Sequence, residues 1–227
     1  MSGALLYLLL LIPAMVLHEV AHGYVAHLLG DDTARNQGRL TLNPLKHIDR
    51  FGTVLLPLML AAGQIASLGH VQFLYGWAKP VPINSMNLNI NGRKNPRRLM
   101  AIVAFAGPAM NFILALAAGF ALHGGVGQDY LLFFMEINLL IGIFNLFPLP
   151  PMDGGRIAVG LLPLPLARVL ARAERLGILA VLLVLFILPV VMQQFGVRFE
   201  PFQDAMGVIL PYAEHIVLVA TGNGFGN

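Results

Sequence analysis

Long apolar stretches constrain this chain more than any other feature of its sequence. A helix needs roughly 20 apolar residues to cross the hydrocarbon core of a bilayer. Five stretches approach that length, at 4–29, 51–74, 99–122, 131–150 and 176–192, and a weaker sixth lies at 205–221. They predict an all-α polytopic membrane protein, a helical bundle of about four to six transmembrane helices.

The composition points the same way. Hydrophobic residues make up 57% of the 227 residues and charged residues only 11%, whereas about 25% of a soluble domain is charged. So few charges cannot cover the surface of a soluble fold of this size, so we expect a lipid bilayer around the chain. This composition argues against most nucleic-acid binders, and we expect no nucleic-acid partner. The chain has no cysteine, which leaves His, Asp and Glu as its strong metal ligands.

The basic residues indicate the topology. If 51–74 spans the membrane, the 14 Lys and Arg residues divide five to nine between the two sides; if it enters and returns, they divide thirteen to one. The positive-inside rule prefers the second arrangement, and Pro57, Gly63 and Gly69 suit a bend in a re-entrant segment. We therefore predict a multi-pass protein of the cell membrane with its basic loops in the cytoplasm and its N-terminus outside. The alternative is a spanning helix with a weak charge bias.

A polar region separates the first and third apolar stretches. Residues 38–43 alternate in period two, and 77–84 carry prolines that suit an edge strand or an extended loop. We predict a small membrane-associated β element within the β and re-entrant region 30–98.

The first apolar stretch contains His18-Glu19-Val20-Ala21-His22, an H-E-x-x-H pattern. On a helix the two imidazoles lie about 40° apart in rotation and about 6 Å apart along the axis, so both can reach one metal ion. Glu19 can then meet a water at the metal without being a ligand. Ionisable groups inside an apolar helix are costly unless partnered, which favours a metal site over a packing cluster or a proton relay.

Zinc normally takes three protein ligands in a catalytic site, and Asp153 is the best third candidate. It follows the proline-rich end of the fourth stretch, where the helix must break. Asp153 lies at the same depth in the membrane as His18 and His22 only if an odd number of transmembrane spans separates them. The re-entrant arrangement provides this odd number. The plain alternative is an Asp-Gly turn.

Two asparagines are further candidates. Asn111 lies in the third stretch, one turn after Pro108, and a buried neutral amide there suits donation to a developing oxyanion. The alternative is an amide that bonds a neighbouring helix. Asn145 has the same ambiguity, or it holds an extended substrate backbone.

These residues resemble the site-2 protease family of intramembrane zinc metalloproteases. The resemblance rests on HEVAH at 18–22, GPAMN at 107–111 and FNLFPLPPMDGGR at 144–156. It covers about 1–175, which it identifies as a metalloprotease core, and leaves 176–227 as a C-terminal transmembrane helix or helices. The chain is similar to a compact prokaryotic form without a PDZ or CBS domain.

The resemblance implies one zinc ion per chain, held by His18, His22 and Asp153 near the cytoplasmic face. It also implies Glu19 as the catalytic carboxylate and Asn111 as a substrate or oxyanion contact. The expected activity is hydrolysis of peptide bonds in or near a transmembrane helix of a membrane-protein substrate. Two rival functions are an ion or proton transporter, whose path would add Glu136, and a non-catalytic metal-binding scaffold.

Overall fold

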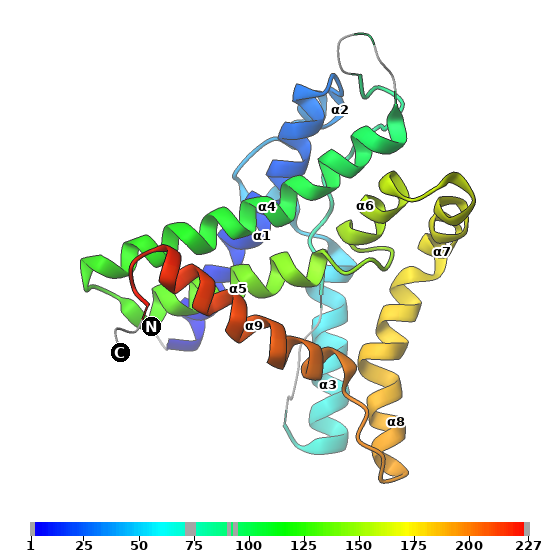
Figure 1. The fold of residues 1–227 in the computed structure, drawn as a ribbon. Coiled ribbons are helices and arrows are strands. Elements are labelled where there is room, and N and C mark those ends of the chain that lie inside the picture. The colour runs from blue at the N-terminus through cyan, green and yellow to red at the C-terminus, as the bar shows by residue number, and fades with distance from the viewer. Residues whose placement is uncertain (1–2, 71–75, 90–91, 93–94, 225–227) are drawn as a thin grey trace.

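The computed structural model describes residues 3–70, 76–89, 92 and 95–224, and all regular secondary structure in this part of the chain is helical (Figure 1). None of these residues belongs to a β-strand. The helices are α1 (Gly3–Leu28), α2 (Thr33–Asn36), η1 (Pro44–His47), η2 (Arg50–Leu55), α3 (Leu56–Leu68), α4 (Pro96–Ala121), η3 (Leu122–Gly124), α5 (Gln128–Asn145), α6 (Asp153–Leu161), α7 (Leu164–Leu182), η4 (Leu183–Ile187), α8 (Leu188–Gln194) and α9 (Pro201–Ala220).

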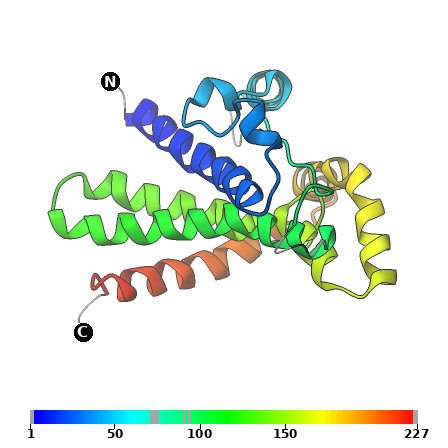
Figure 2. The same ribbon diagram turned by 90° about the horizontal axis from the view of Figure 1, so that it is seen from above.

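Four long helices form a bundle with α4 at its centre. Helix α4 packs against α1, α5, α6 and α9, and Figure 2 shows α1 and α5 running in one direction and α4 and α9 in the other. The core that α4, α5 and α9 share at one end consists of Ala115, Ala118, Met135, Leu139 and Val217. The weak sixth apolar stretch is therefore part of this bundle, as α9. Among the described residues, Leu9–Leu28 and Pro96–Gly124 are long and apolar enough to cross a bilayer.

The second apolar stretch leaves the bundle and comes back to it. Helix α3 runs crosswise to the bundle, as do α8 and the end of α7, and these helices are seen end-on in Figure 2. The end of the stretch, 71–74, lies outside the described residues. The Trp77 N–H donates to the Gly52 carbonyl at 3.2 Å, so the chain returns to the place where the stretch began. This is the path expected of a returning segment.

The small β element predicted between the first and third stretches is not found among the residues of this region that the structure describes. Residues 77–84 are extended, but side chains and turns take up their backbone groups. The Val81 N–H donates to the Glu19 carboxylate at 2.9 Å, and the Asn84 N–H donates to the Asp31 carboxylate at 2.6 Å. A ladder needs these donors to face a second strand, so the extended segment does not pair into a sheet.

Asp31 anchors this extended segment to the end of α1. Its side chain is buried and accepts hydrogen bonds from the Thr33 N–H, the Asn84 N–H and the Asn87 side-chain amide at 3.1, 2.6 and 3.0 Å. Burial raises the pKa of Asp31, but the hydrogen bonds from Thr33, Asn87 and Asn84 outweigh it and hold the pKa below its usual range. Ionised Asp31 therefore stabilises the fold.

Replacing Asp31 by Asn is expected to destabilise the protein by about 1–3 kcal/mol, because buried donors lose a charged acceptor. Thermal unfolding in detergent at neutral pH measures the loss. Since the pKa of Asp31 is lowered in the folded state, its contribution is present above about pH 4 and declines as the pH falls further. The difference between the wild type and Asp31→Asn should shrink over the same range.

The control is Asp32→Asn. Asp32 bonds to His27 at 2.6 Å at the exposed surface, where such pairs contribute little. An equal loss of stability in both variants, or a loss for Asp31→Asn that persists in acid, would contradict the anchoring role.

Candidate metal centre

Helix α1 presents the two histidines of the H-E-x-x-H pattern to the bundle interior, where both are buried. Their Nε2 atoms lie 3.1 Å apart. One oxygen of Asp153, Oδ2, lies 3.1 Å from His18 Nε2 and 3.2 Å from His22 Nε2. The structure thus brings together all three ligands expected from the sequence, although Asp153 lies 131 positions after His22 in the chain.

The size of this triangle suits zinc. Zinc bonds to nitrogen and oxygen at about 2.0–2.2 Å in a tetrahedral arrangement, which places neighbouring ligand atoms roughly 3.3 Å apart. The observed separations of 3.1–3.2 Å correspond to one face of such a tetrahedron.

The protons of the cluster also require a cation. His22 Nδ1 lies 2.8 Å from the Val103 carbonyl oxygen, which only accepts hydrogen bonds, so Nδ1 carries the proton and a neutral ring has a lone pair at Nε2. Asp153 Oδ2, when ionised, is also an acceptor. Two acceptors 3.2 Å apart in a buried site repel each other unless a proton or a metal cation lies between them. Two imidazoles and a carboxylate are a ligand set that fits zinc.

Gly107 on α4 provides the space for this cluster. A Cβ atom at this position would lie 2.4 Å from His22 Nε2 and 2.6 Å from His18 Nε2. No other residue type fits unless the imidazoles move. The sequence pattern gave no separate role to Gly107, because the need for it arises only where α4 crosses α1.

The proline-rich turn before α6 carries Asp153 to the histidines. Asp153 is the first residue of α6 and is not part of a simple Asp-Gly turn. A Cβ atom at Gly154 would lie 2.2 Å from the Leu146 carbonyl oxygen, and one at Gly155 would lie 2.5 Å from the Pro150 nitrogen. The two glycines therefore let the turn fold tightly against the start of α6, where the helix dipole favours a carboxylate.

Glu19 lies beside the cluster and is not one of its three ligand groups. Its Oε2 accepts the hydrogen bond from the Val81 N–H, and Val81 packs against Gly23 one turn further along α1. Val81 also lines a cavity of about 520 Å³, together with Pro80, Ile83, Arg97, Met100 and Arg156. The segment whose backbone holds the Glu19 carboxylate therefore also forms part of the wall of this cavity.

Asn111 is not placed as a substrate contact. It is completely buried, and its Oδ1 lies 2.6 Å from His18 Nδ1. Its amide nitrogen donates to Asn138 Oδ1 at 2.8 Å and to the Ala14 carbonyl at 3.3 Å. Both amide protons are committed, which leaves none for an oxyanion. In this structure the amide oxygen bonds the far side of His18, and the expected role of Asn111 at an oxyanion stays a prediction.

Asn145 lies at the end of α5, partly buried, before the proline-rich turn. Its amide nitrogen donates to the Ile141 carbonyl at 3.0 Å, which uses one of its two N–H groups. Its role as a substrate contact stays a prediction.

Comparisons with known proteins agree with the site. The family described as Peptidase family M50 matches residues 6–128 and 125–189. "Putative zinc metalloprotease YwhC" of Bacillus subtilis (strain 168) is 41% identical over 192 residues, which cover 79% of this chain and 78% of that protein. "Putative zinc metalloprotease Rip2" of Mycolicibacterium smegmatis is 30% identical over 207 residues, which cover 86% of this chain and 71% of that protein. No solved structure matches the chain significantly.

Replacing Gly107 by Ala is expected to abolish metal binding, because the added methyl group displaces the imidazole nitrogens. The metal content of the detergent-purified protein measures this, with less than about one tenth of the wild-type zinc expected, since displaced ligands lose the site. Gly207→Ala on α9 is the matched control, because a Cβ there meets no atom within 4 Å. Full zinc occupancy in folded Gly107→Ala would show that the imidazoles do not need this space.

Proposed function

Since the chain belongs to peptidase family M50, the site-2 protease family of zinc metalloproteases, we propose that it hydrolyses peptide bonds in or near the transmembrane helices of membrane-protein substrates. Its cofactor is zinc. The main support for this proposal is the buried triangle of His18, His22 and Asp153, with the Glu19 carboxylate beside it. We assign the three corners of the triangle as zinc ligands.

Zinc, when bound, supplies a Lewis acid that polarises the scissile carbonyl and makes water a stronger nucleophile. The protein's own contribution is proton transfer by Glu19. The Val81 N–H fixes one oxygen of this carboxylate at 2.9 Å and leaves the other to take a proton from the attacking water. The same carboxylate then returns the proton to the leaving amine.

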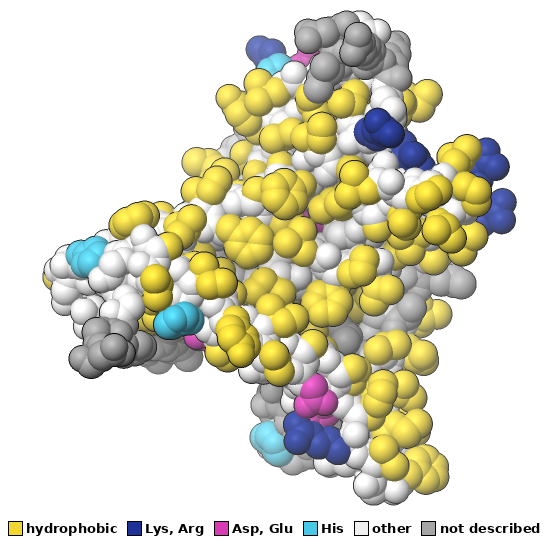
Figure 3. Space-filling view, viewed as in Figure 1, with side chains coloured by type: hydrophobic (Ala, Val, Ile, Leu, Met, Phe, Trp, Pro, Cys, Tyr) yellow, Lys and Arg dark blue, Asp and Glu magenta, His cyan; other side chains and the backbone are white. Residues whose placement is uncertain are grey.

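The surface supports a position inside the bilayer. Apolar side chains cover the face over α4, α5 and α9 (Figure 3), and Phe105, Ile113 and Phe120 of α4 are each at least half exposed. Water disfavours such a surface, whereas lipid does not. We propose that α1, α4, α5 and α9 span the membrane within a core of 1–175 and a C-terminal part of 176–227, which is consistent with four to six transmembrane helices.

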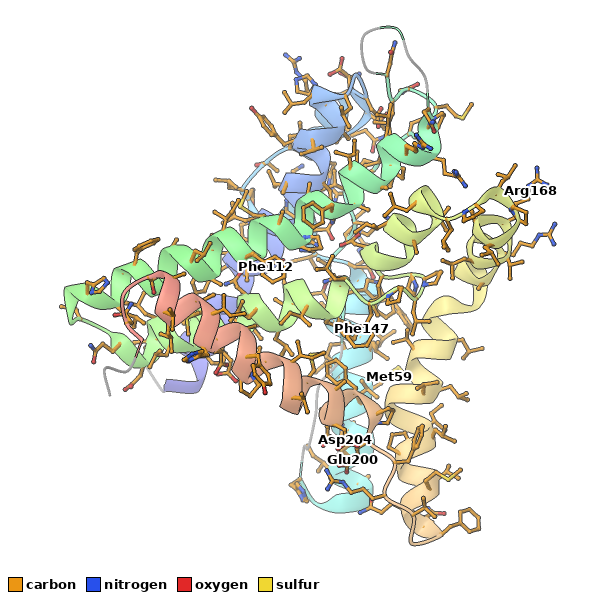
Figure 4. All side chains as sticks on the ribbon, in the orientation of Figure 1. Met59, Phe112, Phe147, Arg168, Glu200 and Asp204 are labelled. Atoms are coloured by element: carbon orange, nitrogen blue, oxygen red, sulfur yellow. The ribbon has the colours of Figure 1, made fainter. Side chains whose placement is uncertain are left out.

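Basic side chains gather at one end of the bundle, where α4 begins and where α6 leads into α7 (Figure 3). Arg168, labelled in Figure 4, projects outward there. By the positive-inside rule we assign this end to the cytoplasm and the N-terminus to the outside. The metal centre, which includes the first residue of α6, then lies nearer the cytoplasmic face.

The cavity beside Glu19 indicates how the substrate is presented. A helical substrate buries its carbonyls in its own hydrogen bonds, so it must unwind before its backbone can be attacked. The extended segment at 77–84 forms one wall of the cavity and offers an extended partner for an unwound peptide. Asn145, with one amide proton uncommitted in α5, is our candidate for a contact to the substrate backbone.

Glu19→Gln tests the mechanism directly. The variant is expected to fold and to hold zinc at the wild-type level, since Glu19 is not a ligand, but to lose at least about 10²-fold in cleavage rate. The assay is hydrolysis of a helical membrane peptide in detergent or liposomes, with zinc content measured on the same preparation. Cleavage at the wild-type rate would exclude Glu19 as the base.

Asp153→Ala separates the protease from its two rivals. This variant should lose both zinc and peptidase activity, because two imidazoles are too few for a stable site. A transporter would instead move ions across liposomes and be indifferent to chelators, and a metal-binding scaffold would hold zinc without cleaving peptides. Either result in the wild-type protein would contradict the proposed function.

A further inference from the structure

We infer that Asn138 on α5 is a positioning residue for the metal centre, which it reaches through Asn111 on α4 to fix the tautomer and orientation of His18 on α1. The inference rests on the metal site of the proposed function and adds to it a residue that contacts neither metal nor substrate. It follows from a continuous chain of buried hydrogen bonds whose directions have only one consistent assignment.

The series of hydrogen bonds begins at a backbone carbonyl group, which can only accept a hydrogen bond. Asn138 is completely buried, and its amide lies 2.7 Å from the Phe134 carbonyl oxygen, four residues back in α5. A carbonyl oxygen has no proton to give, so the Asn138 atom that faces it must be the NH₂ group. The amide oxygen of Asn138 therefore faces the opposite way, towards α4.

The orientation of Asn138 determines which group donates in the next hydrogen bond. The oxygen of Asn138 lies 2.8 Å from the amide of Asn111, so the Asn111 atom at this contact must be its NH₂ group. A second acceptor demands the same orientation, since the Ala14 carbonyl oxygen lies 3.3 Å from that nitrogen. The oxygen of Asn111 is left to face His18.

The last bond sets the protonation of the ligand. Asn111 Oδ1 lies 2.6 Å from His18 Nδ1, and because this oxygen accepts, Nδ1 must carry the proton. A neutral imidazole then has its lone pair at Nε2, the atom that lies 3.1 Å from Asp153. His22 obtains the same tautomer directly from the Val103 carbonyl, whereas His18 obtains it from two side-chain amides.

The relay cannot readily be replaced by solvent. Asn111 and Asn138 have no exposed surface, and an amide group that loses its partner there has no water to bond. Without the Asn138 oxygen, only the longer bond to the Ala14 carbonyl, at 3.3 Å, still holds the Asn111 NH₂ group, so Asn111 turns over more readily and presents its NH₂ group to His18. That rotation favours a proton on Nε2, where it competes with the metal.

The test compares Asn138→Leu with Asn145→Leu. Both asparagines lie on α5 and donate to the carbonyl four residues back, at 2.7 and 3.0 Å, but only Asn138 belongs to the relay. Zinc affinity is measured by competition with a chromophoric chelator in detergent. We expect Asn138→Leu to bind zinc about tenfold more weakly, at the lower end of the effects of outer-shell partners, and Asn145→Leu to bind it with wild-type affinity.

Two further measurements separate positioning from a loss of fold. Asn138→Asp, provided that its buried carboxyl group is protonated and donates to the Phe134 carbonyl in place of the amide, keeps an acceptor oxygen towards Asn111 and should recover most of the zinc affinity. Nitrogen NMR of the zinc-free wild type should show His18 protonated at Nδ1, with the proton shifting towards Nε2 in folded Asn138→Leu. These measurements do not depend on peptide cleavage, so a zinc-binding protein without peptidase activity would refute the proposed function and leave the relay intact.

Wild-type zinc affinity in folded Asn138→Leu would overturn the inference. So would an equal loss in Asn145→Leu, or an Nε2-protonated His18 in the zinc-free wild type, which can be observed even if Asn138→Leu fails to fold.

Discussion

Three hydrogen-bond acceptors held within 3.2 Å of one another are the constraint around which this structure is organised. In a buried site they repel one another unless a proton or a metal cation lies between them. The packing that creates the repulsion comes from the rest of the fold, since α4 approaches α1 at Gly107 and a proline-rich turn delivers Asp153. Metal binding and helix packing are therefore coupled: the metal relieves the repulsion, and the packed helices hold the ligands at the required separation.

The polar residues inside the bundle are arranged to support that centre. His22 donates to the Val103 backbone carbonyl, and His18 bonds to an amide pair that ends at another backbone carbonyl. In an apolar bundle an unpaired polar group costs several kcal/mol, so each of these bonds stabilises the fold and fixes a metal ligand at the same time. The stabilising and positioning roles of Asn111 cannot be separated by stability measurements alone.

The sequence predicted the parts of the site that depend on local geometry. His18 and His22 share one face because they are four residues apart on a helix. Asp153 was proposed from its place after the proline-rich end of the fourth apolar stretch, and the count of spans between the ligands supported it. The sequence failed where the answer depends on contacts between distant segments. The orientation of Asn111 is set by Asn138 on another helix, and the described part of the extended segment lies in no strand, since Glu19 and Asp31 bond two of its donors.

The same contacts make the region between the first and third apolar stretches a working part of the site. The Val81 N–H holds the Glu19 carboxylate, while Asp31 ties the segment that carries Val81 to the end of α1. The carboxylate that we propose as the base is thus oriented by a segment about 60 residues away, which also lines the cavity. A peptide that occupies the cavity must touch the segment that aims the base, so substrate position and base orientation are set by one element.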